Sequence, residues 1–267
     1  MVRDEYRNVA LGGRLMVEAQ NDTPFALSLG QTAEMRQINF RLGWKQVAPL
    51  QTAQFLIRPE RVLRGKLPTS VAWAAGLGLR ASTAVLDLVM RGRRGADVRQ
   101  VARFGPEHDC VWQQMARTVE CAVVRDASYL NWKYVDQPGQ QFLRLEVRQG
   151  GAAKAIAVCM VREPDEFYKY SRAFLLDLVA PTRDDGLVMD AIQAAGLAAA
   201  DAGADSISCL HVGAWLTQRL KRSGYFLRSP ERFLLIQPGD LTETERDSVL
   251  TGDNWYVTQG DSDLDRP

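Results

Sequence analysis

Apolar and polar positions along this chain form two kinds of pattern, one typical of strands and one typical of helices. The second half of the chain shows both most clearly. "RAFLLDLVA" (172–180) and "SISCLHV" (206–212) are near-continuous apolar runs, which are typical of strands buried inside a sheet. "DGLVMDAIQAAGLAAADAG" (185–203) lies between them and has the helical period. A long helix joining two buried strands predicts a right-handed crossover, with the two strands parallel and adjacent at the centre of a sheet.

Shorter patterns predict further elements on both sides of this unit. "QFLRLEVRQGGAAKAIAVCMV" (141–161) predicts a hairpin that turns at Gly150 and Gly151. Thr32 and Asp126 are placed to cap helices, and Gly43 to end one. Other strands are predicted at 25–30, 46–57, 98–104, 231–237 and 254–258, and helices at 9–21, 32–43, 107–116, 126–135 and 214–224. The fold class is therefore α/β, with a mixed sheet flanked by helices.

The organisation along the chain predicts three parts. Residues 1–65 form a short first module, 66–97 a linker that contains a helix, and 98–267 a longer module that ends in an acidic, mostly solvated tail of ten residues. The apolar stretch 71–90 is broken by Arg80 and Asp87, so a buried linker helix is favoured over a membrane span. A membrane-surface role for this stretch stays open, because three arginines follow it.

Composition narrows the range of partners. The formal net charge is +1, from 33 basic and 32 acidic residues, so no global field draws the chain to nucleic acid or to an acidic membrane. The start lacks a secretory apolar run, which favours a cytoplasmic protein. The four cysteines, at 110, 121, 159 and 209, have no paired spacing and are predicted to be free thiols. His108 and Cys110 are too few for a zinc site, so no metal is predicted.

The stretch "EYRNVALGGRLMVEA" (5–19) has the features of a phosphate cradle at the start of a helix. Backbone N–H groups at a helix start, together with the helix dipole, can hold a pyrophosphate, and glycine permits close approach. Arg7, Gly12 and Gly13 supply a charge and two glycines. The alternative is an amphipathic helix whose small residues serve packing.

The order of strands and helices, with these motifs, resembles the GNAT superfamily of acyl-CoA N-acyltransferases. "RNVALGGRL" resembles its acyl-CoA loop and "FRLGW" the end of the following helix, so the first 60 residues match only the back part of such a domain. Residues 98 to about 258 resemble a complete domain. "VVRDASYLNWKYVDQPGQQF" and "WYVTQGDSDLDRP" are similar to tandem GNAT-like proteins associated with bacterial surface-polysaccharide genes. Two explanations of the partial first module stay open. Either this chain lacks an N-terminal stretch, or the first module survives only as a structural remnant that packs on the second.

The resemblance implies acetyl-CoA as acyl donor, and a small-molecule amine as acceptor, such as an amino sugar or glycan precursor. It places the cofactor on Arg7, Val9, Ala10, Leu11, Gly12 and Gly13. Asn39 stands where the family often has a tyrosine acid, and an amide can only donate a hydrogen bond to the sulfur. The candidate bases are Asp126 and Asp177, with a helix cap and a strand-edge polar residue as their structural alternatives. Trp132 and Tyr134 could stack on a sugar, or belong to the core.

The second module departs from the family's pattern where its own cofactor loop would lie, at "PTRDDGL" (181–187). Pro181 offers no N–H, and Asp184 and Asp185 oppose a pyrophosphate, so these aspartates are expected to cap a helix. The alternative function is therefore a non-catalytic binding or scaffold module in polysaccharide biosynthesis. A relation to Fem-type aminoacyl transferases ranks lower. The first 60 residues, which carry the apolar faces of 9–21 and 25–30, are expected to dock against the second module through the linker helix 71–90. The alternative is that they pair with another chain to complete a sheet, as in a homodimer.

Overall fold

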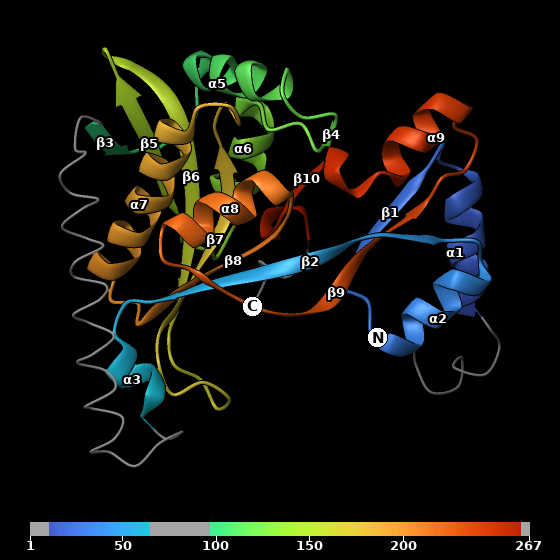
Figure 1. The fold of residues 1–267 in the computed structure, drawn as a ribbon, viewed down its shortest axis with the longest axis horizontal. Helices are drawn as coiled ribbons and strands as arrows, with labels where there is room; N and C mark the ends of the chain where they lie inside the picture. Colours follow the sequence, from blue (N-terminus) through green and yellow to red (C-terminus); the bar gives the residue numbers. More distant parts are fainter. Residues whose placement is uncertain (1–10, 65–96, 263–267) are drawn as a thin grey trace.

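The computed structural model describes residues 11–64 and 97–262, and Figure 1 shows their arrangement. The strands form a ten-stranded sheet in the order β1-β9-β2-β8-β7-β6-β5-β3, with β10 paired to β8 and β4. The strands are β1 Ala26–Leu29, β2 Lys45–Leu56, β3 Asp97–Gln100, β4 Cys121–Ala122, β5 Leu143–Gln149, β6 Ala152–Arg162, β7 Arg172–Val179, β8 Ser206–Val212, β9 Phe226–Gln237 and β10 Trp255–Thr258. The helices are α1 Leu11–Asn21, α2 Ala33–Arg41, α3 Pro59–Leu63, α5 Pro106–Ala116, α6 Ala127–Tyr134, α7 Asp185–Asp201, α8 Ala214–Arg222 and α9 Glu243–Leu250, with 3-10 turns η2 Gly252–Asn254 and η3 Gln259–Asp261.

The centre of the sheet confirms the crossover predicted from the sequence. β7 and β8 are adjacent and parallel, and α7 connects them. Their pairing is short, because it runs only from Arg172 opposite Ser206 to Phe174 opposite Ser208. A register shift follows in β7, where Leu175 faces Cys159 of β6 and Asp177 faces Val158. The two central strands are therefore paired only over their first residues.

The two ends of the chain share one sheet. β2 lies between β8 and β9 and is antiparallel to both, and β1 pairs with β9. As expected, the first part of the chain docks against the later strands, and it does so through β1 and β2. Pairing with another chain stays a prediction. The predicted linker falls on residues 65–96, which lie outside the described residues. The division into 1–65, 66–97 and 98–267 stays a prediction.

Helices cover both faces of the central strands. In Figure 1, α7 and α8 lie across the front of these strands. α5 and α6 pack on the opposite face, where His108 reaches Glu146 of β5 and Tyr134 reaches Asp177 of β7. The residues of β6 from 155 to 159 are all 0% exposed, as a strand between two helical layers must be. Burial of each large aliphatic side chain here contributes about 1.5–3 kcal/mol.

Local signals in the sequence explain where several elements begin and end. The side chains of Thr32 and Asp126 accept hydrogen bonds from the first turns of α2 and α6, which confirms both predicted caps. Gly43 ends α2 with φ 88°, and Gly150 and Gly151 form the hairpin turn with φ 58° and 81°. Only glycine adopts such left-handed backbone without strain.

The C-terminal stretch departs from the prediction of a mostly solvated tail. Thr258 and Gln259 are buried, and the carboxylate of Asp261 lies inside the protein beside Arg125. The sequence interpretation also missed α9, which Thr242 and Glu245 cap reciprocally. The tail is thus part of the core as far as Asp261, and residues 263–267 lie outside the described residues.

Candidate functional site

The predicted phosphate cradle lies at the limit of the described residues. Arg7, Val9 and Ala10 fall outside them, so their predicted contacts with a cofactor remain a prediction. Leu11 and Gly12 open α1. Gly13 is exposed, and a Cβ added there would meet no atom within 4 Å. The described part of the cradle is therefore open at Gly13, and the backbone here belongs to a regular helix.

Asn39, predicted to lie near the thiol of the cofactor, is buried in α2 with 1% of its surface exposed. Its backbone carbonyl accepts hydrogen bonds from the N–H groups of Leu42 and Trp44, each at 3.0 Å. Among the described residues, its side-chain Oδ1 has no hydrogen-bond partner. An unsatisfied buried amide oxygen costs about 1–3 kcal/mol. A hydrogen-bond donor that reached this oxygen would remove that cost.

Asp177 and Tyr134 come together, but inside the protein. Asp177 is 0% exposed, its Oδ2 accepts a hydrogen bond from the Tyr134 hydroxyl at 2.8 Å, and its Oδ1 accepts one from Nε of Arg125 at 2.7 Å. Arg125 is likewise 0% exposed. A carboxylate sealed from solvent and held by arginine cannot take a proton from an incoming amine. In this conformation Asp177 and Tyr134 form a structural network, which favours the structural alternatives stated for both over the roles of base and sugar platform.

Asp261 completes this network from the end of the chain. Its Oδ2 lies 2.5 Å from Nη2 of Arg125 and also accepts the backbone N–H of Thr258 at 2.8 Å. Burial disfavours the charge on Arg125, but Asp177 and Asp261 outweigh that effect and raise its pKa. Burial raises the pKa of Asp261 above its ordinary value, against the opposing pull of Arg125. One arginine between two buried carboxylates connects the segment before α6 to β7 and η3.

The other two predicted residues on α6 lie apart from this network. The side chain of Asp126 accepts the Tyr129 N–H at 2.8 Å as the helix cap, which is the structural alternative stated for it. Trp132 is 57% exposed and its ring lies 5.8 Å from that of Tyr129. Trp132 is therefore accessible to a ligand, whereas Asp126 already uses an oxygen to satisfy a backbone donor.

The C-terminal segment fills the space beside β7 where β7 leaves β8. β10 pairs with β8 through Thr258 opposite His211, and the Tyr256 hydroxyl donates a hydrogen bond to the Leu178 carbonyl of β7. A Cβ at Gly260 would stand 3.0 Å from the Leu176 carbonyl oxygen and collide with the Tyr134 hydroxyl, so glycine alone fits. β10 thus forms hydrogen bonds with backbone groups of β7 and β8 beyond the point where these two strands stop pairing with each other, and η3 packs beside them.

The turn from β7 into α7 carries negative rather than positive charge. The Asp184 side chain accepts the Leu187 N–H at 3.0 Å, which confirms its predicted role as the helix cap. Asp185 forms ion pairs with Arg219 and Arg222 of α8. The start of α7 is therefore occupied by the chain's own carboxylates, which compete with any phosphate there.

A pocket of about 320 Å³ lies across the strands at the start of β7 and β8. We call it the arginine pocket, since its lining includes Arg162, Arg172, Arg228 and Arg232. Residues opposite each other in neighbouring strands share a face of the sheet, and Arg162 lies opposite Arg172, and Phe174 opposite Ser208. Thr52 and Gln54 of β2, with Ser206 and Ser208 of β8, line the middle of the pocket. The pocket is therefore built from five adjacent strands, β9-β2-β8-β7-β6.

The charges of the arginine pocket are only partly balanced. Arg172 pairs with Asp165 and lies over the Tyr168 ring, 3.7 Å from its centroid. Within the described ranges, Arg228 and Arg232 have no carboxylate at ion-pair distance, and the one acidic residue of the lining is Glu231. Burial raises the pKa of Tyr170 against the opposing field of nearby arginines. The pocket therefore carries a net positive charge.

Sequence reasoning missed this pocket, although one signal was present. In "SISCLHV" the first and third residues are serines, so one face of an otherwise apolar strand begins polar. That alternation marks a sheet face that is not packed against a helix at its beginning. The arginines come from strands far apart in the sequence, and no local motif connects them.

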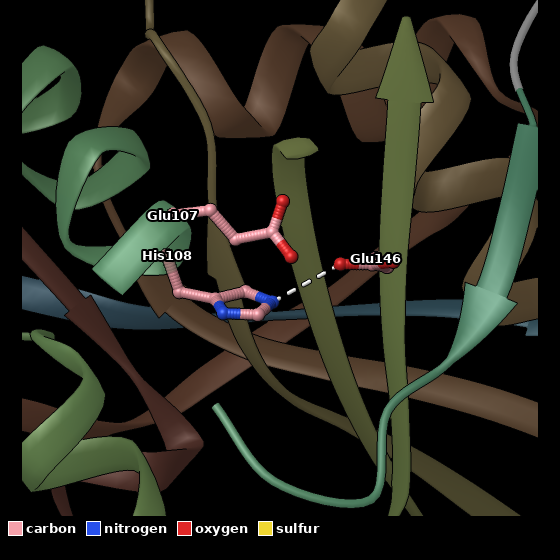
Figure 2. Close-up of side chains that lie close together, drawn as sticks. All are labelled: Glu107, His108 and Glu146. Carbon is pink, nitrogen blue, oxygen red and sulfur yellow. Dashed lines mark hydrogen bonds and ion pairs between the residues drawn. The ribbon is translucent and has the colours of Figure 1, made fainter. Parts of the chain in front are cut away.

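A second cluster joins α5 to β5 and contains groups that bind metals elsewhere in proteins. Figure 2 shows Glu107, His108 and Glu146 close together, with ligand atoms within 4.8 Å of one another. Nδ1 of His108 accepts the Gly105 N–H at 2.9 Å and Nε2 lies 3.1 Å from Glu146, and both contacts are satisfied by the tautomer in which Nε2 donates to the carboxylate. The histidine therefore offers no free lone pair toward the two carboxylates.

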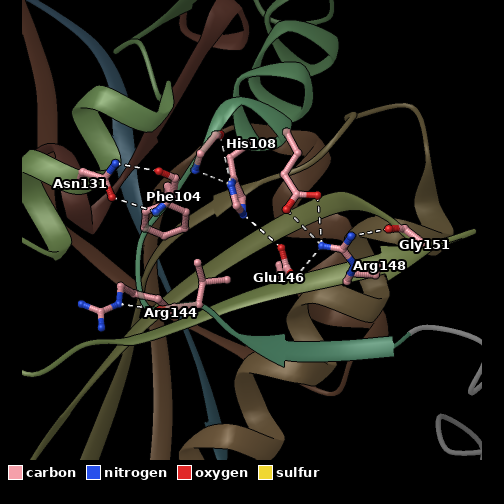
Figure 3. A network of polar contacts seen from close by, with 10 residues as sticks. Phe104, His108, Asn131, Arg144, Glu146, Arg148 and Gly151 are labelled. Atoms are coloured by element: carbon pink, nitrogen blue, oxygen red, sulfur yellow. Dashed lines mark hydrogen bonds and ion pairs between the residues drawn. The ribbon is translucent and has the colours of Figure 1, made fainter.

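Arg148 already balances these carboxylates, and Figure 3 shows it beside Glu146. Its Nη1 lies 2.8 Å from Glu146 and 3.1 Å from Glu107, and the hydrogen bond from Arg148 lowers the pKa of Glu107. The Asn131 side chain extends the network by bonding both the N–H and the carbonyl of Phe104, at 2.9 Å each. A cation would have to displace Arg148. The cluster thus holds α5 against the sheet, and the donor set does not fit a metal.

Comparison with known proteins connects this fold to the N-acetyltransferases. A GCN5-related N-acetyltransferase from Anabaena variabilis is similar in structure over 88% of this chain and 52% of its own length, with a TM-score of 0.53 and 11% sequence identity. A probable N-acyltransferase from Enterococcus faecalis is similar over 88% and 51%, with a TM-score of 0.51 and 10% identity. This chain has the GNAT fold and spans about half the length of each.

Searches with the sequence itself find no relatives of this kind, since no protein-family model and no curated protein matches the chain. None of the helices in the described ranges combines the length and the apolar character needed to cross a bilayer. The predicted linker helix at 71–90 lies outside those ranges.

Proposed function

We propose that the protein is an acyl-CoA-dependent N-acyltransferase, with acetyl-CoA as donor and an amino sugar or related glycan precursor as acceptor. The observation that carries the proposal is the position of the arginine pocket. It opens across β7 and β8, the parallel pair that α7 connects in the GNAT fold. A polar, charged pocket on the central strands suits a hydrophilic acceptor better than an apolar one.

The acyl transfer in this proposal needs no covalent intermediate on the protein. The acceptor amine attacks the thioester carbonyl directly, and its proton leaves to water, because Asp177 is sealed and Asp126 caps a helix. The C–S bond then breaks, and the coenzyme leaves as a thiolate that takes a proton from water. The chain contributes mainly by holding the two substrates in reach of each other. Arg7 and the backbone from Val9 to Gly13 are proposed to hold the phosphates of the donor, and Asn39 to lie near its sulfur.

A thiol-release assay tests this function. The full chain is incubated with acetyl-CoA and a panel of amino sugars, free coenzyme thiol is measured over time, and N-acetylated product is identified by mass spectrometry. The proposal expects acceptor-dependent thiol release that Arg7→Ala weakens. A chain that shows no binding of acetyl-CoA in calorimetry, and that releases no thiol above the acceptor-free control, is not an N-acyltransferase of this kind.

One observation favours a second function, a non-catalytic binding module in glycan assembly. β10 and η3 fill the space beside the end of β7, and the turn into α7 is lined by aspartates with partners of their own. Both features leave little room for a coenzyme in this module. This reading expects a ligand in the arginine pocket and no binding of acetyl-CoA.

A further inference from the structure

The arginine pocket has a chemistry of its own beyond that of a generic acceptor site. Two arginines of β9 lie on one side, Arg228 opposite Thr52 and Arg232 opposite Leu50. Arg162 and Arg172 lie on the other side, three or four strands away in the sheet. At about 4.8 Å per strand, the two sides are roughly 14–19 Å apart at the backbone. Long arginine side chains from both sides therefore extend toward a common space.

Hydroxyl groups line the middle of this space. Among the described residues, the side-chain hydroxyls of Thr52, Ser206 and Ser208 have no hydrogen-bond partner. Ser206 is nevertheless 2% exposed, so bulk water reaches little of it. Hydroxyls that are free in a confined polar pocket are ready to bind the hydroxyls or oxygens of a ligand.

The charge pattern indicates which end of the pocket holds an anion. Asp165 already balances Arg172, whereas Arg228 and Arg232 have no carboxylate at ion-pair distance among the described residues. Arginine pairs are suited to phosphate because the planar guanidinium donates two parallel hydrogen bonds. Glu231 of β9 also lines the pocket but forms no ion pair with either arginine, so the β9 side is the side whose arginines are free to bind an anion.

The aromatic residues complete the recognition surface. Phe174 is half-buried in the lining and lies near the guanidinium groups of Arg162 and Arg172, at 5.6 and 5.8 Å from its ring centroid. Tyr168 is exposed at the edge and stacks under Arg172. Such rings offer an apolar surface to the flat face of a sugar ring, next to hydroxyls that bind its polar edges.

We infer that the arginine pocket binds a small phosphorylated ligand rich in hydroxyl groups, of the class of amino-sugar phosphates, with its phosphate on Arg228 and Arg232. The ring lies over Thr52, Ser206 and Ser208. The volume of about 320 Å³ is near the lower end of the ~300–1,000 Å³ range of ligand pockets, which suits one sugar phosphate better than a whole coenzyme. The assignment of this ligand as the acceptor, but not its binding, rests on the proposed function.

Calorimetric titration of the full chain tests the pocket with four probes: glucosamine 6-phosphate, glucosamine, inorganic phosphate and acetyl-CoA. We expect the sugar phosphate to bind most tightly. Arg228→Gln and Arg232→Gln should each weaken it about 10- to 100-fold, since each removes a charge-assisted hydrogen bond. Ser208→Ala should weaken it about two- to tenfold. Arg117→Gln is the matched control, because Arg117 is an exposed arginine at the end of α5, outside the pocket lining.

The outcomes separate this inference from the proposed function. Glucosamine binding as tightly as its phosphate, or unchanged affinity in both β9 variants, overturns the inference. Acetyl-CoA binding that depends on Arg228 and Arg232, without sugar-phosphate binding, overturns it too and assigns the pocket to the donor's phosphates. Tight sugar-phosphate binding without thiol release supports the pocket and contradicts the N-acyltransferase. Thiol release with an unphosphorylated sugar, unaffected by the β9 variants, supports the N-acyltransferase and contradicts the assignment of the pocket.

Discussion

His211 should make the stability of this protein sensitive to mild acid. The side chain is 0% exposed in β8, and its Nε2 lies 2.8 Å from the Thr217 hydroxyl oxygen. Burial lowers the pKa of His211 from 6.5 to about 4. The folded state therefore excludes a proton that the unfolded chain binds, so this contribution to stability is complete above pH 6.5 and is lost as the pH falls toward 4.

The size of the effect follows from the gap between the two pKa values. At pH 5 the unfolded histidine is protonated and the native one is mostly neutral, and each pH unit below 6.5 costs about 1.4 kcal/mol. Lowering the pH from 7 to 5 should thus remove about 2 kcal/mol of unfolding free energy through His211 alone. That is a large part of the typical ~5–15 kcal/mol stability of a domain.

Urea unfolding at pH 7 and pH 5, followed by tryptophan fluorescence, measures this loss. The control is His211→Gln, which keeps a hydrogen-bonding group for Thr217 and does not titrate. Carboxylates titrate alike in both proteins, so the difference between the two losses isolates His211. Equal losses in the two proteins would refute the reasoning. If the variant does not fold, NMR titration of the two histidines of the chain decides instead, and a value near 6.5 for His211 would refute it.

Two further predictions concern the predicted catalytic residues. Arg125→Met leaves two buried carboxylates without their cation and should cost about 3–5 kcal/mol of unfolding free energy, and a loss under about 1 kcal/mol would show that the network is not structural. Asp126→Ala should cost about 1 kcal/mol in thermal unfolding, whereas Asp126→Asn should retain nearly all the stability, because both Asp and Asn cap helices. Loss of acyl transfer in the Asn variant, with stability intact, would restore Asp126 as a base.

Some parts of this fold could be predicted because their signal is local. The β7-α7-β8 unit is encoded in continuous apolar runs and a long helical period, and the caps at Thr32, Asp126 and Asp184 each lie three residues or fewer from their partners. Such features can be predicted without knowledge of tertiary contacts, and the structure confirms both the β7-α7-β8 unit and the three caps.

The buried network could not be predicted, because its members meet only in space. Asp261 belongs to an acidic C-terminal stretch, and its partner Arg125 lies in the middle of the chain. Composition alone describes "GDSDLDRP" as solvated, and only the closure of β10 against β8 brings Asp261 inside. The same holds for the arginine pocket, since its charges come from β6, β7 and β9.

The position of β2 has a consequence for the synthesis of this protein. Gln51 pairs with His211, so more than half of the chain lies between the two strands. At ~5–20 residues per second, a ribosome needs roughly 10–30 s after completing β2 to supply β8 and β9. Throughout that time β2 lacks both of its strand partners, and the nascent chain is vulnerable to aggregation. Folding of the sheet must therefore be largely post-translational, and bacterial expression should depend strongly on chaperones that shield the early strands.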